Sequence, residues 1–214
     1  MGIPGYHRLP ENIRVVGCWA HLRRKFDEAV SALPKEQQTN CTALEGVQYC
    51  NVLFAIEKEL ADLPPEERYI QRLERSKPIM DALLAWAETK AAPPKSALGK
   101  ALYYLREQWP YLKRFLEDGR LEISNNRAER SIKPFVMGRK NWLFANTEGG
   151  AQSSAIVYSL IETAKENGLD PYQYLVYVLS RAPSMAATNG GWAAKLTPDL
   201  VPAQCRRIQE HSTT

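Results

Sequence analysis

The chain has 214 residues, of which 44% are hydrophobic and 24% are charged, and its net charge is +4. This composition excludes collagen-like, disordered and membrane-embedded classes, because it supplies a core but contains no apolar run of membrane length. Charged residues interrupt the first twenty positions, where a secretory signal needs an apolar stretch, so we expect a cytoplasmic protein. Its four scattered cysteines predict reduced thiols rather than disulfides.

The positive charge is concentrated in two stretches. Residues 8–25 and residues 120–144 each carry a local charge of +4, so the rest of the chain carries −4. Such stretches suit a polyanion such as DNA, and solvated helix faces rich in Arg and Lys are the equal alternative. The candidate phosphate contacts are Arg23, Arg24, Lys25, Arg127, Arg130, Lys133, Arg139 and Lys140.

The first predicted elements are a strand and a helix. Residues 14–19 are rich in β-branched side chains and predict a single short strand. An apolar stripe from Leu22 to Ala29 then has helical spacing, and Pro34 ends that helix. Between Thr42 and Gly119 every apolar repeat is helical, so we expect a helical subdomain whose last helix ends at Gly119.

A polar segment leads into the next predicted helix. Asn126 and Glu129 have the spacing of a capping box, in a short helix that Pro134 ends or kinks. Residues 141–144 predict a second short strand, and residues 148–150 predict a turn. Glu129 is therefore expected either to cap this helix or, given its basic neighbours, to take part in chemistry.

Two further helices are predicted after residue 150. One runs from about residue 151 to Gly168, and the other begins with Asp170 as N-cap and Pro171 as the first helical residue. Residues 184–214 show little periodicity and predict a poorly ordered tail.

Three strings in this sequence stand out: DGRLEISNNRAERSIKPFVMGRKNWLFAN from residue 118, GCWAHLRRKFDEA from residue 17 and SLIETAKENGLDPYQYLVYVL from residue 159. Together they resemble the C-terminal half of a bacterial transposase of the insertion sequence 66 family. The strings are long and occur in the family's order. The resemblance covers nearly the whole chain to about Pro183, and it is looser between residues 40 and 119.

The resemblance implies a mainly α chain with a few short strands, in which a truncated RNase H-like α/β core carries a helical insertion. It divides the chain into a core remnant at 1–35, the insertion at 36–119, the glutamate helix and following strand at 120–150, a C-terminal helical element at 151–183 and the tail at 184–214.

The resemblance also implies a DDE-type chemistry in which two aspartates and one glutamate hold two divalent ions, with magnesium expected. Glu129, inside NNRAER, matches the glutamate. In-line phosphoryl transfer needs such converging carboxylates. Met1 stands where the family's second aspartate is expected, so we expect a C-terminal fragment or truncated reading frame that is inactive alone. The alternative is a non-catalytic regulator that binds transposon-end DNA or full-length transposase, or associates with itself.

Other residues are expected to support this site. Cys18 and His21 match a Cys-x-x-His unit that the resemblance places at the active-site wall, together with Asn125 and Asn126. A packed cysteine and a satisfied histidine are the equal alternative, and zinc is disfavoured because no second Cys/His pair has suitable spacing. Trp142 is predicted either to stack on an unpaired DNA base or to pack in the core.

Overall fold

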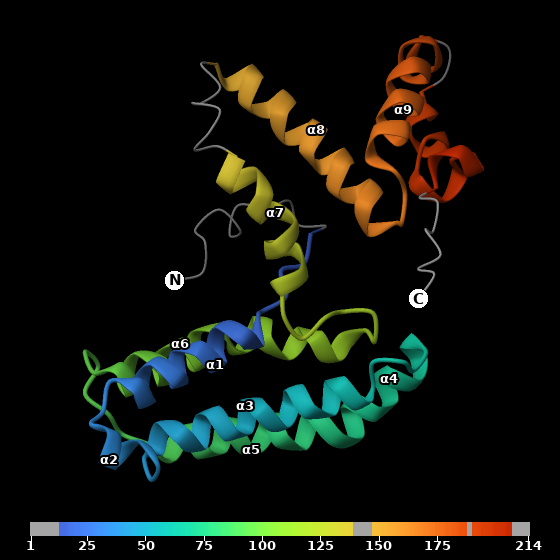
Figure 1. The fold of residues 1–214 in the computed structure, drawn as a ribbon. Coiled ribbons are helices and arrows are strands. Elements are labelled where there is room, and N and C mark those ends of the chain that lie inside the picture. The colour runs from blue at the N-terminus through green and yellow to red at the C-terminus, as the bar shows by residue number, and fades with distance from the viewer. Residues whose placement is uncertain (1–12, 139–146, 188–189, 207–214) are drawn as a thin grey trace, which may run out of the picture. The chain divides into compact units, whose positions relative to one another are not determined.

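The computed structural model describes residues 13–138, 147–187 and 190–206, and these are almost entirely helical (Figure 1). The mainly α prediction is thereby confirmed. The chain divides into two compact units, residues 1–128 and 129–214. Within the described ranges no helix has the length and apolarity needed to cross a membrane. The predicted strand at 141–144 and the candidate residues Arg139, Lys140 and Trp142 lie outside the described residues.

Four long helices lie side by side in unit 1 (Figure 1), where α1 packs against α3 and α6 and α3 also packs against α5. The boundary predicted at residue 35 falls inside this unit, because α1 shares its core with helices of the predicted insertion. The elements are α1 (Trp19–Ser31), α2 (Lys35–Gln38), α3 (Thr42–Glu59), α4 (Pro65–Gln71), the π-helix η2 (Arg72–Ser76), α5 (Lys77–Thr89), α6 (Ala97–Leu112) and the 3-10 helix η3 (Lys113–Glu117).

The core of unit 1 forms around the apolar stripe of α1. Trp19, Leu22 and Phe26 are fully buried, as the helical spacing predicts. The Trp19 indole N–H donates to the Leu112 carbonyl at 3.1 Å, so the one polar atom of this ring is satisfied. On α3, Gly46 leaves room for the Phe26 ring, since an added Cβ would lie 2.6 Å from it.

The strand predicted at residues 14–19 does not form. Residues 13–18 lack regular secondary structure, and Trp19 is already the first residue of α1. Isolated hydrogen bonds hold this segment, from the Gly17 N–H to the Tyr111 carbonyl at 2.9 Å and from the Trp19 N–H to the Ile123 carbonyl at 3.0 Å. Its β propensity is overridden because, in the described part of the chain, no second strand pairs with it.

Residues 65–89 run through α4, η2 and α5 without a break. The Lys77 N–H bonds to the Arg72 carbonyl, the five-residue step of a π turn. Pro78 follows and has no N–H to donate to a regular α-helical bond, which favours the wider turn at this point. The change of helix type places Arg72 and Ser76 in the interior.

Unit 2 continues from α7 (Asn126–Gly138), which begins at the end of unit 1 and runs past Pro134 rather than ending there. α8 packs against α9, and 3-10 helices η4 and η6 pack against α9. Asp170 caps α9 as predicted, because its Oδ1 accepts the Gln173 N–H at 2.9 Å. The other elements are α8 (Glu148–Glu166), α9 (Pro171–Ala186), η4 (Trp192–Lys195), η5 (Pro198–Leu200) and η6 (Ala203–Cys205).

Two expectations for unit 2 are wrong. The turn predicted at residues 148–150 is the first turn of α8, because the Thr147 hydroxyl accepts the Gly150 N–H at 3.1 Å and caps the helix. The predicted tail is ordered over residues 190–206. There the Tyr174 hydroxyl donates to the Leu196 carbonyl at 3.0 Å, and Leu196, Val201 and Cys205 are buried with α9. A few apolar residues are thus enough to order this segment, because a neighbouring helix covers them.

Gly119 has a different role from the one predicted. The 3-10 helix η3 ends at Glu117, and Gly168 is the glycine with positive φ among those described. At Gly119 an added Cβ would lie 1.9 Å from the Pro65 carbonyl oxygen. The close approach of two backbone segments therefore requires glycine here.

Gly119→Ala is expected to lower the free energy of unfolding by about 1–3 kcal/mol, because the methyl group must displace the backbone of α4. Gly149→Ala is the matched control, since a Cβ there meets nothing within 4 Å and alanine favours the helix. Urea unfolding measures both. Equal midpoints for Gly119→Ala and the parent chain would contradict the close approach.

Candidate functional site

The two motif segments that the resemblance singled out lie against each other in unit 1. Cys18 immediately precedes α1, and its Sγ accepts the Asn125 N–H at 3.5 Å, although the two residues are 107 positions apart. The bond between Trp19 and Ile123 joins the same segments. Cys18 is buried at this junction, and His21 is half-buried in the first turn of α1.

Asn125 has unused hydrogen-bonding capacity at the junction. Its Oδ1 is buried, and it has no hydrogen-bond partner among the described residues. Buried polar atoms in folded proteins are nearly always paired, so this oxygen distinguishes Asn125 from its neighbours. The asparagine that precedes α7 is thus held by its backbone and not by its side-chain oxygen.

A polar cavity of about 350 Å³ lies beside α1. It brings together Arg23 and Arg24, two of the predicted phosphate contacts, with Asn126. Arg23 Nε donates to Asn51 Oδ1 on α3 at 2.7 Å. The remaining lining residues are Ala20, Asp27, Asn51 and Phe54.

The other predicted phosphate contacts that the structure describes are not among the residues that line this cavity. Lys25 pairs with Glu28 at 2.8 Å, and Arg127 pairs with Glu122 at 3.1 Å. In unit 2, Arg130 lines a second cavity of about 350 Å³ with Ser131, Glu162, Lys165 and Glu166, where acids balance bases. Lys133 is exposed on α7. Among the described candidates, Arg23 and Arg24 are thus the two cations that line one cavity together, and the lining includes one acid for the two of them.

Glu129 is exposed in the first turn of α7. The helix begins at Asn126, which is therefore the first helical residue and not the N-cap that the capping-box spacing predicted. A carboxylate in a first turn is favoured by the helix dipole. Within the described ranges no three His, Cys, Asp or Glu side chains are grouped to hold a metal ion. A two-ion site needs several converging carboxylates, so the described residues do not by themselves complete the site that the resemblance implies.

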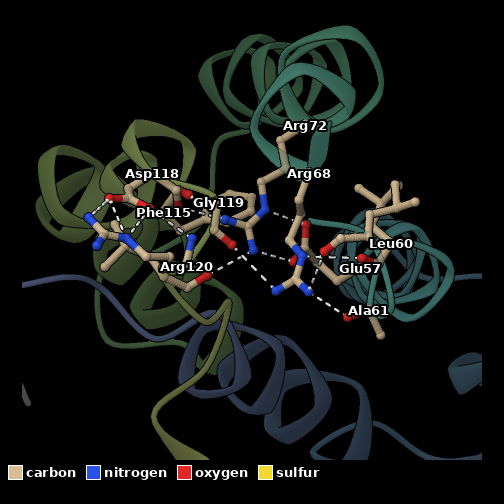
Figure 2. Close-up of polar contacts among 11 residues, drawn as sticks. Glu57, Leu60, Ala61, Arg68, Arg72, Phe115, Asp118, Gly119 and Arg120 are labelled. Atoms are coloured by element: carbon tan, nitrogen blue, oxygen red, sulfur yellow. Dashed lines mark hydrogen bonds and ion pairs between the residues drawn. The ribbon is translucent and has the colours of Figure 1, made fainter. Parts of the chain in front are cut away.

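The segment that leads into α7 is held by a buried arginine that the sequence analysis missed (Figure 2). Arg72 is 1% exposed, and its guanidinium donates to both Glu57 oxygens, at 2.8 and 2.6 Å. It also donates to the carbonyls of Phe115 at 3.0 Å, Asp118 at 2.9 Å and Leu121 at 2.7 Å. One side chain thus ties residues 115–121 to α3.

Neighbouring arginines reinforce this anchor (Figure 2). Arg68 donates to the carbonyls of Leu60 at 3.1 Å and Gly119 at 3.3 Å, which joins the end of α3 to the same segment. Asp118 pairs with Arg120 at 2.6 Å. The hydrogen bonds from the Arg120 side chain and backbone lower the pKa of the Asp118 carboxyl to about 2.

A spacing in the sequence does point to Arg72. Counting back from buried Leu83 and Met80 in steps of three or four residues reaches Ser76 and then Arg72. The charge of Arg72 argued against a buried position, because an isolated buried charge is costly. The apolar residues Ile70 and Leu73 of the same segment are exposed instead.

Comparison of the sequence with known protein families places the chain among the transposases. Residues 2–153 match the Transposase IS66 family, and residues 159–194 match the IS66 C-terminal element. The chain therefore belongs to the IS66 family of transposases.

Three proteins of Sinorhizobium fredii are similar to this chain, and each is described as uncharacterized. y4hP is 35% identical over 181 residues, which are 80% of this chain and 33% of the relative. y4qI is 36% identical over 195 residues, which are 90% of this chain and 34% of the relative. y4jD is 37% identical over 187 residues, which are 85% of this chain and 36% of the relative. The chain thus spans about a third of the length of these relatives. No solved structure matches it significantly.

Proposed function

We propose that this chain supplies the glutamate-bearing C-terminal part of a DDE-type transposase domain, which acts on transposon-end DNA by metal-dependent phosphoryl transfer. The family match over residues 2–153 carries the proposal, because it includes both segments that meet at Cys18 and Asn125. In this proposal α1 belongs to an RNase H-like core and residues 36–119 are its helical insertion. The protein acts on DNA in the bacterial cytoplasm.

The division of roles follows from the contacts. Glu129 contributes one carboxylate to a magnesium site that upstream residues of the family's catalytic domain complete. Arg23 and Arg24 contact DNA phosphates, since they line one cavity and arginine suits phosphate. Arg72 and Arg68 are positioning residues for the segment that precedes α7.

The chain by itself is expected to be inactive, because one carboxylate of the triad does not hold two ions. The purified chain, mixed with magnesium and transposon-end DNA, should produce neither nicked nor joined strands on a denaturing gel. Glu129→Gln is the control for any contaminating nuclease. Magnesium-dependent cleavage that disappears in Glu129→Gln would overturn this expectation.

A non-catalytic role is the second candidate, and the cation-lined cavity of unit 1 favours it. In this role the chain occupies transposon ends and blocks the complete enzyme. Added in excess to a transposition reaction, the chain should then lower the rate, and the double variant Arg23→Gln/Arg24→Gln should restore it. An unchanged rate would argue against this role.

A further inference from the structure

We infer that the cavity beside α1 binds one unpaired nucleotide of a DNA strand, with its phosphate on Arg23 and Arg24 and its base against Phe54. The inference rests on the proposed function and deepens it. It adds α3, through Asn51 and Phe54, to the surface that contacts DNA.

The polar side of the cavity suits a phosphodiester. Arg23 is half-buried, and its bond to Asn51 at 2.7 Å fixes the plane of the guanidinium through Nε. The terminal N–H groups of a guanidinium held in this way match the oxygens of a phosphate. Arg24 adds a second positive charge, and Asp27 is the acid on the lining, so the lining carries a formal charge of +1.

The other side of the cavity suits a base. Phe54 packs against the core of unit 1 and also lines the cavity, so its ring is held in place while part of it stays accessible. Aromatic rings on such basic surfaces stack DNA bases without regard to sequence. The volume of about 350 Å³ lies within the range of small-ligand sites. Bases in a duplex are paired and stacked inside the helix, so an unpaired nucleotide is the form that fits.

Fluorescence anisotropy on the full chain at low salt tests this inference. Three labelled oligonucleotides of equal length are compared: a single strand, the same strand with its bases removed, and a duplex. The natural single strand should bind about tenfold more tightly than the abasic strand, because base stacking contributes to binding. Asn51→Asp should lower the affinity for the single strand about tenfold, since the carboxylate keeps the bond to Arg23 but cancels its charge.

Asn40→Asp is the matched control, because it makes the same change at an exposed position outside the cavity lining. The affinity of Asn40→Asp for the single strand should stay within about twofold of that of the parent chain. Phe54→Leu supplies a second readout: it should bring the natural and abasic strands to equal affinity while the abasic affinity stays constant. Circular dichroism shows whether each variant is folded. If Asn51→Asp unfolds, the ratio of the affinities of Phe54→Leu for the natural and abasic strands decides whether the base contacts Phe54.

Two outcomes separate this inference from the proposed function. If natural, abasic and duplex DNA bind equally and Asn51→Asp behaves as Asn40→Asp does, the nucleotide site is wrong while electrostatic DNA binding by the chain stands. If none of the three binds at low salt, DNA contact by this part of the protein fails as well.

Discussion

Arg72→Met is expected to lower the free energy of unfolding of unit 1 by about 3–5 kcal/mol, the usual cost of removing one partner from a buried ion pair. The Glu57 carboxylate, 11% exposed, loses both of its donors. The carbonyls of Phe115, Asp118 and Leu121 each lose a hydrogen bond as well. Urea unfolding followed by circular dichroism measures the loss.

Arg75→Met is the matched control three residues further along η2. Arg75 pairs with Glu59, but the two side chains are 38% and 60% exposed, so the loss should be at most about 1 kcal/mol. The double variant Arg72→Met/Glu57→Leu should lose less stability than Arg72→Met alone, because the orphaned carboxylate is gone. Equal losses for Arg72→Met and Arg75→Met would show that the buried network does not hold unit 1 together.

Glu129→Gln is expected to abolish transposition in a full-length protein that restores the upstream part of the family's catalytic domain, while the melting temperature barely moves. As a group in the first turn of α7, the carboxylate contributes about 0.3–1 kcal/mol through the helix dipole, a small part of the total. In the proposed magnesium site the carboxylate is required, because glutamine lacks the charged oxygen. Transposition frequency and thermal unfolding are measured on the same preparations.

Glu122→Gln is the comparison that separates the two roles of Glu129. Glu122 is also acidic within the second basic stretch, and it pairs with Arg127 at 3.1 Å on an exposed surface. Its loss should change stability by less than about 1 kcal/mol and leave transposition intact. Should both variants transpose equally well, Glu129 is only a helix-terminal carboxylate, and its match to the family's glutamate is wrong.

The helices follow from features that are local in sequence, and for that reason they were predictable. The stripe from Leu22 to Ala29 and the Asp170 cap before Pro171 depend on residues within one or two turns. The strand predicted at residues 14–19 does not form, because a strand depends on residues that are distant in sequence. A strand exists only with a partner strand, and the N–H groups of Gly17 and Trp19 donate instead to the carbonyls of Tyr111 and Ile123.

The same distinction between local and long-range features applies to the candidate site. The sequence by itself predicted Glu129, Arg23 and Arg24 as candidates, because the family strings and the clustered charge are features of consecutive residues. Only the tertiary structure placed Asn125 on Cys18 and Arg23 on Asn51, since each contact joins elements that are far apart along the chain.

Arg72 shows most clearly why such long-range contacts could not be predicted from the sequence. A charged residue is assigned to the surface unless partners are known, because burial without them is prohibitive. Its partners are one carboxylate 15 residues away and carbonyls 43, 46 and 49 residues away, which converge only after the helices pack. Local periodicity therefore determined which segments are helical, and packing decided which polar groups enter the interior and hold the segment before α7.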